Sequence, residues 1–442
     1  MNVTHDSHGT HTSPMTPERA APPMEHLSKL EHVWRLVAII SGVFALIFTY
    51  RVVGQSGLVH EQFFRAYLLG FWPCFGLTLG SLGLLMVQHV TGGKWGVVIR
   101  RILEAATRNI WIVFAMILPL FYYLDGQFRG LGYLYPWSAS YTHKLSEAAQ
   151  KVAAIRYPWM SDTWVLARVL IMFAIWMVFI YILNKWSLRL DSKIESHEEY
   201  EKLRLRFMRL AGGGLVVYSL TMSLAGIDWT MSLDPIFYST IWGMMYMVGP
   251  ALGALCFVII NLHILSAEEP MQSFLRKKEL HDIGKLLLAF VMLYTYLNWS
   301  QFLIIWSGNL LDEIPWYKMR MHEGWQAVTY YLVLFHFAVP FVALLNSNLK
   351  KKTKSLATVA MLILVSRWVD YYWHIMPNFP DTNPLNPGLA GKMHITVYDI
   401  ILPVAMISLW IASFYRNLKQ RPLIPAYHHL VPEIMEPDHG AH

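Results

Sequence analysis

Ten long apolar segments constrain the fold of this chain more than any other feature of its sequence. Most have about the length that an α-helix needs to cross a bilayer, roughly 20 residues. Backbone groups in lipid must be hydrogen-bonded within a segment, so such runs predict helices. The segments are 33–50, 66–87, 110–124, 164–183, 210–227, 241–265, 286–305, 327–345, 356–376 and 400–415. We predict an all-α integral membrane protein with about ten transmembrane helices.

Composition and the ends of the chain fit this class. More than half of the residues are hydrophobic, and 18 Trp with 23 Tyr suit the aromatic belts at membrane interfaces. The first residues are polar and include His5, His8 and His11, for which a solvated tail is favoured over weak metal binding. We therefore expect a flexible cytoplasmic tail at 1–32, a transmembrane domain at 33–416 and a cytoplasmic tail at 417–442.

The distribution of Lys and Arg predicts the orientation. The loops after even-numbered segments and the C-terminal tail hold 22 of them, whereas the loops after odd-numbered segments hold nine. Cytoplasmic loops of membrane proteins carry the excess of positive charge. Both termini are therefore expected in the cytoplasm. The net charge of +7 is explained by these loops and membrane lipids, so no nucleic-acid partner is expected.

The ninth segment contains ionisable residues at membrane depth. Arg367, Asp370, Tyr371 and His374 are spaced by three, four and seven residues, which places them on one helical face. Charges at this depth are costly and normally face a protein interior or a watery cavity. They form either a buried ion pair that fixes helix packing or a stripe that conducts protons or faces a quinone.

Polar residues of other segments fall at a similar depth and are expected to converge with this stripe. A proton relay needs donors and acceptors within hydrogen-bond reach or bridged by water. Taken singly, each has a structural alternative, such as a bond between helices or a capped turn at Asp234-Pro235. The candidates by position are Asp228, Asp234, Tyr294, Asn298, Gln301 and His336.

Two further sets of charged residues lie nearer the membrane surfaces. Arg168 is expected to reach a carboxylate on another helix, either Asp228 or Asp399. On the cytoplasmic side, four residues are either a site of proton uptake or ordinary interfacial residues, and the second interpretation is slightly favoured. These residues are His89, His263, His281 and Asp282.

Few side chains can hold a redox metal. Cys74 and Cys256 are isolated, which excludes an iron–sulfur cluster or a thiolate zinc site built by this chain alone. His336 is the one clear mid-membrane histidine, whereas membrane haem b needs two facing each other. We expect no cofactor bound by the chain, no metal site and no catalytic residue of a soluble enzyme, so it is not catalytic alone.

Five stretches resemble the second quinone-type membrane subunit of alternative complex III, in the NrfD-like polysulfide-reductase membrane-subunit family. The resemblance spans roughly residues 33–420. The stretches are VTGGKWG at 90–96, DWTMSLDPIFYSTIWG at 228–243, LHDIGKLLLAF at 280–290, YLNWSQFLIIWSGN at 296–309 and SRWVDYY at 366–372.

The resemblance implies a ten-helix subunit with two four-helix bundles and two peripheral helices, in a bacterial inner (cytoplasmic) membrane. It would serve a quinol:cytochrome c (or other acceptor) oxidoreductase of a respiratory or photosynthetic chain. Implied partners are a homologous quinol-binding membrane subunit, an iron–sulfur subunit, haem c subunits and small membrane subunits. Quinone or quinol is a possible ligand, while haem c and iron–sulfur clusters belong to the partners.

The resemblance also implies a proton path. The resemblance assigns this role to Asp228, Asp234, Tyr296, Ser300, Gln301, Arg367 and Asp370. Asn298, His336 and His374 are added because of their depth and helical face. Two other functions remain open. A secondary transporter also uses charges at the membrane midplane, although clear repeats with broken helices are missing. A structural anchor for peripheral redox subunits would use the stripe for packing alone.

Overall fold

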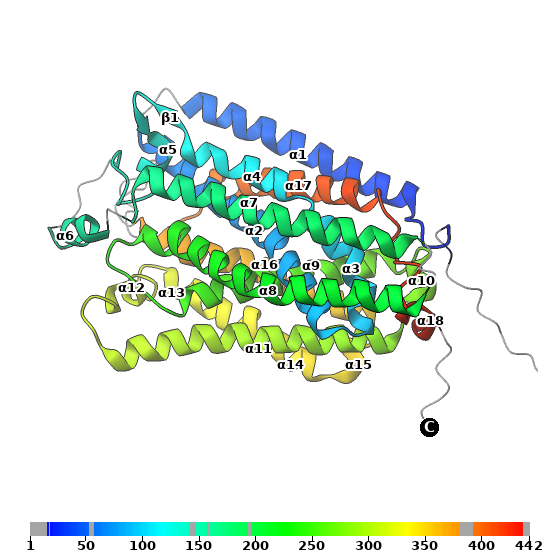
Figure 1. Cartoon of the computed structure of the whole chain (residues 1–442). Helices are drawn as coiled ribbons and strands as arrows, with labels where there is room; N and C mark the ends of the chain where they lie inside the picture. The colour runs from blue at the N-terminus through cyan, green and yellow to red at the C-terminus, as the bar shows by residue number, and fades with distance from the viewer. Residues whose placement is uncertain are drawn as a thin grey trace, which may run out of the picture.

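Long helices lie side by side and form a bundle with connecting segments at its two ends (Figure 1). The structure is a computed structural model that describes residues 16, 18–52, 57–141, 147–156, 159–192, 196–379 and 392–435. Within these residues the only strands are the short β1 (Tyr123–Leu124) and β2 (Gln127–Phe128), which form a hairpin. The chain is therefore all-α in its architecture.

Nine helical stretches of the described chain are long and apolar enough to cross a membrane. They are Met24–Ile47, Glu61–Thr91, Lys94–Phe121, Asp162–Asp191, Glu198–Leu233, Trp242–Leu265, Lys277–Gly308, Trp325–Leu345 and Val397–Leu418. Each overlaps a segment expected from the sequence, so the expectation of a multi-pass helical membrane protein is confirmed.

The ninth apolar segment of the sequence is the exception. It forms α16 (Thr353–Ile375), which is 23 residues long and runs within the bundle, but it is not among the nine. Arg367, Asp370 and His374 make its second half polar. The count of ten spans therefore stays a prediction.

Except for α9, the long helices extend beyond the apolar segments. They are α1 (Met24–Val52), α2 (Gly57–Thr91), α7 (Asp162–Ser187), α8 (His197–Trp229), α9 (Trp242–Leu265), α11 (Lys277–Gly308) and α17 (Val397–Leu418). Two spans are composite. One joins α3 (Lys94–Thr107), α4 (Ile110–Ile117) and the 3₁₀ turn η1 (Leu118–Phe121), and the other joins α13 (Trp325–Tyr331), η4 (Leu332–Ala338) and α14 (Val339–Leu345).

Short elements occupy the ends of the bundle. They are α5 (Arg129–Gly132), α6 (Glu147–Arg156), η2 (Leu188–Asp191), η3 (Met231–Leu233), α10 (Met271–Phe274), α12 (Ile314–Met319), α15 (Ser347–Lys350), η5 (Met376–Asn378) and α18 (Leu430–Met435). Residues 142–146, which precede α6, lie outside the described residues.

Helices α2 and α9 form the centre of the bundle. They pack along each other and are mostly buried, and α2 also contacts α3, α4, α8 and α17, while α9 contacts α8, α11 and α16. Helix α1 packs along α17 on the outside. The resemblance implies two four-helix bundles. Helices α2 and α9 contact each other directly, and the division into two bundles remains a prediction.

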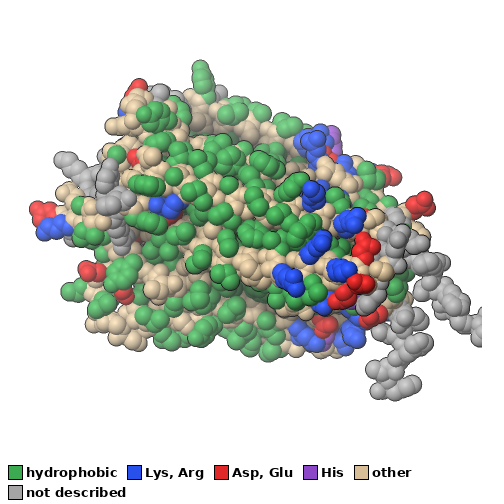
Figure 2. Space-filling view, in the orientation of Figure 1, with side chains coloured by type: hydrophobic (Ala, Val, Ile, Leu, Met, Phe, Trp, Pro, Cys, Tyr) green, Lys and Arg blue, Asp and Glu red, His purple; other side chains and the backbone are tan. Residues whose placement is uncertain are grey.

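The two ends of the bundle differ in charge. Figure 2 shows a broad apolar surface over α7 and α8, with Lys and Arg gathered at one end. We call this the basic end; it holds α10, α15 and α18, and the opposite far end holds α5, α6 and α12. Exposed cations of the basic end include Lys202, Arg206 and Arg209 on α8 and Lys277 on α11.

Two helix starts differ from the sequence expectation. The third span begins at Lys94 rather than near 110, because the charged residues Arg100, Arg101 and Glu104 of α3 are buried against other polar groups. Their charge made this stretch look like a loop. Helix α1 begins at Met24, within the range 1–32 expected to form a tail, and residues 1–15 and 17 lie outside the described residues.

The central contact between α2 and α9 depends on a glycine. A Cβ atom at Gly80 would overlap the backbone carbonyl group of Pro250. Small residues at helix interfaces allow backbones to approach closely in membrane proteins.

We predict that Gly80→Ala lowers the free energy of unfolding by about 1–3 kcal/mol, because α2 and α9 must move apart. Thermal unfolding of the detergent-purified protein would measure this. Gly213→Ala is the matched control, since no atom lies within 4 Å of its Cβ position. Equal stability of the two variants would contradict the close contact.

Candidate functional site

The polar face of α16 meets α11 in the interior of the bundle. The Tyr294 hydroxyl donates a hydrogen bond to Oδ2 of Asp370 at 2.5 Å, and Nη1 of Arg367 donates to the same oxygen at 2.7 Å. All three side chains are at most 4% exposed. Hydrogen bonds to a charged acceptor are among the stronger ones in proteins. This oxygen is therefore the centre of a compact charged site.

Aromatic rings and a glycine accommodate the arginine. The guanidinium carbon of Arg367 lies 4.4 Å from the ring centre of Tyr294 and 4.7 Å from that of Tyr371. A Cβ atom at Gly249 on α9 would lie 2.5 Å from Nη2 of Arg367. Cation–π contacts strengthen where water is excluded. The absence of a side chain at Gly249 leaves the space that the guanidinium occupies.

Two histidines lie next to this charged centre. Nδ1 of His374 is 3.5 Å from Oδ2 of Asp370, and the ring of His336 lies edge-on to that of Tyr294, with centres 5.2 Å apart. Nε2 of His336 and both ring nitrogens of His374 are buried and have no hydrogen-bond partner among the described residues. We call Tyr294, His336, Arg367, Asp370, Tyr371 and His374 the Asp370 cluster.

The histidine on the eighth span lies in an unusual backbone segment. Residues Leu332–Ala338 form a π-helix, η4, between two α-helical turns, and His336 is its buried member. Such wide turns are rare and occur often at functional sites. In this chain the π-helix directs His336 toward Tyr294.

The polar cluster ends abruptly toward the basic end. On α16, residues 356–365 contain one polar side chain, Thr358, which is exposed. The buried residues of α11 over this depth include Ile283, Leu287 and Val291. Ten helical residues span about 15 Å. Neither α16 nor α11 places a buried polar side chain over this distance in the described structure.

Toward the far end, the buried Arg320 lies next to the cluster. From the sequence it was counted with the charges of the loops. Arg320 follows α12 and is 0% exposed. It donates to the carbonyls of Trp316, Trp373 and His374 and lies over the Trp316 ring at 3.5 Å. It thus closes the last turn of α16, whose carbonyls have no partners within the helix.

Burial lowers the pKa of Arg320 to about 9, and the carboxylate of Asp234 acts in the opposite direction. The guanidinium is therefore still protonated at neutral pH. The one sequence feature that indicates burial of Arg320 is its aromatic neighbours in the chain, Trp316, Tyr317 and Trp325.

Three candidates for the proton path form hydrogen bonds that a structural role explains. Oδ1 of Asp234 accepts hydrogen bonds from the backbone N–H groups of Ile236 and Phe237, which makes it the cap of a turn. Gln301 accepts a bond from Ser239, and Asn298 donates to the carbonyl of Tyr294 in its own helix. The structural alternatives considered for Asp234 and Gln301 fit this geometry.

Two candidates from the resemblance are not brought into the cluster. Tyr296 is 65% exposed, because two residues along an α-helix from Tyr294 correspond to roughly 200° of rotation. Ser300 is half-buried, and like Tyr296 it has no contact with Asp370 among the hydrogen bonds and ion pairs of the described residues. Neither residue extends the relay from Asp370.

Asp228 belongs to a separate ion pair. Its Oδ2 lies 2.6 Å from Nε of Arg168, which joins α8 to α7. Arg168 also lies over the Trp159 ring. Of the two carboxylates considered for Arg168, Asp228 is therefore its partner, while Asp399 forms a capping box with Thr396 at the start of α17.

The candidates for proton uptake are dispersed over the basic end. His281 lies 3.2 Å from the hydroxyl of Ser347, Asp282 pairs with Lys285, and His89 stacks on Phe207. His263, near the end of α9, is half-buried. No hydrogen bond or ion pair of the described residues joins these four to each other.

Comparison with known proteins adds no relative. No protein-family model matches the chain, and no curated protein matches it significantly. Within the described residues, no three His, Cys, Asp or Glu side chains are grouped as metal ligands.

We predict that Gly249→Ala displaces Arg367 from its place between the two tyrosine rings and costs about 1–3 kcal/mol of stability. Gly253→Ala, one turn along α9, is the matched control, because its Cβ would meet only Leu364 at 4.0 Å. Thermal unfolding in detergent compares the two. A Gly249→Ala variant as stable as the control would show that the guanidinium does not occupy this space.

Proposed function

We propose that this chain is an integral membrane subunit of a quinol:electron-acceptor oxidoreductase, in which the Asp370 cluster carries protons. One observation carries the proposal. The buried carboxylate of Asp370 accepts a hydrogen bond from the Tyr294 hydroxyl. It lies beside His374, whose ring nitrogens have no hydrogen-bond partner among the described residues. The resemblance of five sequence stretches to alternative complex III supplies the reaction to which proton movement would be coupled.

The chemistry of the cluster suits proton transfer in steps. Arg367 does not lose its proton and keeps Asp370 charged, since guanidinium stays protonated in proteins. Imidazole exchanges protons near neutral pH and can pass them between its two nitrogens. In this scheme His374 takes up a proton on one ring nitrogen, the Asp370 carboxylate stabilises the imidazolium, and a water accepts the proton from the other nitrogen. The ring of His336 lies edge-on to that of Tyr294, and a water would also have to bridge its Nε2 to the cluster.

The apolar stretch toward the basic end makes the two halves of the path unequal. The far-end half uses side chains, and the other half needs water between the cluster and the buried Glu279 and Lys350. We propose that the cluster exchanges protons chiefly with the far end, and that hydration of the apolar half controls passage across the membrane.

We propose that α16 crosses the membrane as a tenth span. Both ends of the described chain lie at the basic end, as an even number of crossings requires (Figure 1). The excess of Lys and Arg there supports a cytoplasmic location of this end, and the resemblance supports the inner membrane of a bacterium. The family supplies the partners: a quinol-binding membrane subunit, an iron–sulfur subunit and haem c subunits.

We predict that Asp370→Asn in the intact complex lowers proton movement per electron and slows turnover at least about tenfold, while the complex still assembles. The asparagine oxygen still accepts from Tyr294, and the tyrosine rings still hold Arg367. A pH-sensitive dye in vesicles driven by quinol would report the coupling.

Asp312→Asn is the matched control, because Asp312 is exposed at the far end. His374→Gln tests the imidazole without removing the charge that compensates Arg367. Normal coupling in both Asp370→Asn and His374→Gln would exclude the proton-carrying role.

A second candidate function is a structural anchor for peripheral redox subunits. It is favoured by the direct Arg367–Asp370 ion pair at 2.7 Å within α16, which Tyr294 joins to α11. Replacing both residues, Arg367→Met with Asp370→Leu, should then leave assembly and turnover nearly unchanged, since packed apolar side chains can substitute for a buried ion pair. Turnover and co-purification of the partner subunits measure this. Under the proton-carrying proposal the double variant loses coupling instead.

A further inference from the structure

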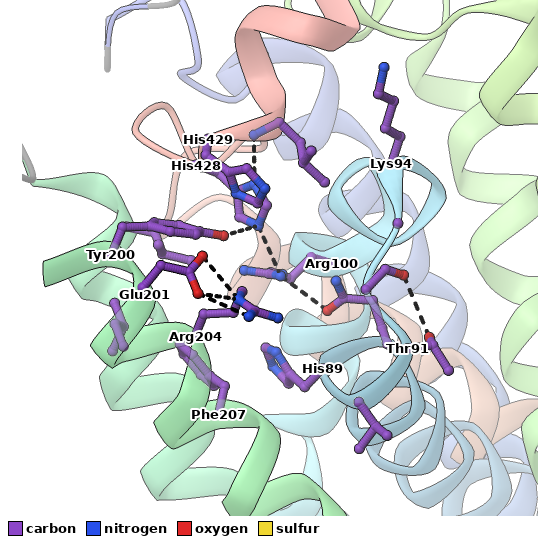
Figure 3. Close-up of a pocket in the computed structure, with 17 residues that line it drawn as sticks. His89, Thr91, Lys94, Arg100, Tyr200, Glu201, Arg204, Phe207, His428 and His429 are labelled. Atoms are coloured by element: carbon purple, nitrogen blue, oxygen red, sulfur yellow. Dashed lines mark hydrogen bonds and ion pairs between the residues drawn. The ribbon is translucent and has the colours of Figure 1, made fainter. Parts of the chain in front are cut away.

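A pocket of about 470 Å³ lies at the basic end, away from the Asp370 cluster (Figure 3). Its wall is made by the end of α2, the start of α3, the first turns of α8 and the segment before α18. This volume is within the range of about 300–1,000 Å³ that is usual for small-ligand sites. The polar residues that line it are Gln88, His89, Thr91, Lys94, Arg100, Tyr200, Glu201, Arg204, His428 and His429.

The deepest charge of the pocket has no carboxylate partner. Arg100 is 4% exposed; its Nη2 donates to Gln88 at 3.1 Å and lies 3.4 Å from Nε2 of His428. Among the described residues no Asp or Glu forms an ion pair with it. Its neighbour Arg101 is different, because it pairs with both Glu104 and Asp191. Glu104 attracts Arg100 without a direct ion pair. A buried cation that no anion contacts directly is costly, and an anion in the pocket would reduce that cost.

One buried histidine of the pocket has an unsatisfied ring nitrogen. His89 is 8% exposed and stacks on Phe207 at 4.3 Å, and its Nε2 has no hydrogen-bond partner among the described residues. His428 is already engaged, because its Nδ1 accepts from the backbone N–H of Leu430 and its Nε2 lies 3.2 Å from the Tyr200 hydroxyl. Burial and the adjacent Arg100 hold the pKa of His428 well below its usual range. An anion beside His89 would accept a hydrogen bond that the protein leaves unused.

The rim of the pocket holds two cations that are each paired with a carboxylate. Arg204 pairs with Glu201, the one acidic residue of the lining, at 2.9 Å, and Lys94 pairs with Glu433 at 3.2 Å. Lys94 begins α3, and the start of a helix carries a partial positive charge that favours anions. The helix terminus and the unpaired Arg100 at the base therefore have the same sign.

We propose that this pocket binds a phosphate group, presented by the headgroup of an anionic phospholipid or by a free phosphate. Guanidinium groups bind phosphate oxygens through paired N–H donors, and Arg100 lies at the base of the pocket while Arg204 lies at its rim (Figure 3). The pocket opens at the charged end of a membrane-spanning bundle, where lipid headgroups lie. The site does not depend on the proposed role of the Asp370 cluster.

The first test is the thermal unfolding of the full chain in detergent. Inorganic phosphate is compared with chloride at equal ionic strength, and micelles containing phosphatidylglycerol are compared with micelles containing phosphatidylcholine. Stabilisation by phosphate identifies a free phosphate as sufficient, and stabilisation by phosphatidylglycerol alone identifies a lipid headgroup. If neither raises the unfolding temperature relative to its control, the proposal is overturned.

The second test uses matched variants. Arg204→Gln removes a pocket guanidinium from the exposed rim, so it should fold normally and weaken binding about tenfold, as expected for one hydrogen-bonded charge. Arg206→Gln is the control, because Arg206 is exposed on the same helix but does not line the pocket. Arg100→Gln, if it folds, should abolish the stabilisation. An equal loss of binding in Arg204→Gln and Arg206→Gln would show general surface attraction and overturn the site.

Discussion

The ion pair between Arg367 and Asp370 is the interaction around which the second half of the bundle is arranged. Each charge alone would be too costly in an apolar interior, and three neighbouring elements contribute to its compensation. Helix α11 contributes Tyr294, which both donates to the carboxylate and stacks on the guanidinium. Helix α9 contributes an empty space at Gly249, and the π-helix contributes His336. The position of α16 follows from these requirements.

The arrangement of the helices follows largely from the apolar segments, because length and hydropathy decide which stretches cross a membrane. The spacing of Arg367, Asp370, Tyr371 and His374 also placed them on one buried face. The same spacing set Tyr294 apart from Tyr296 on the seventh segment. Tyr296 became a candidate through the family resemblance, which does not distinguish helical faces, and it is exposed.

Buried charge was the main source of error. Arg100 and Arg101 in α3 and Arg320 after α12 were counted with the loop charges, yet all three are at most 4% exposed. Their compensation comes from residues far away in the chain, such as Asp191 for Arg101 and the carbonyl of His374 for Arg320. Such partners have no local signature. The same limitation hid the pocket at Arg100, whose wall combines residues from positions 88 to 430.

The π-helix of the eighth span has a consequence for the phase of that helix. Hydrogen bonds that close at i→i+5 take up roughly one more residue per turn than those of an α-helix. The helical phase of α14 is therefore shifted relative to α13, and a period of 3.6 residues carried through from Trp325 assigns the side chains after Ala338 to the wrong face. Removing one residue from η4 would restore a continuous phase and rotate one half of the span against the other, with His336 at the junction.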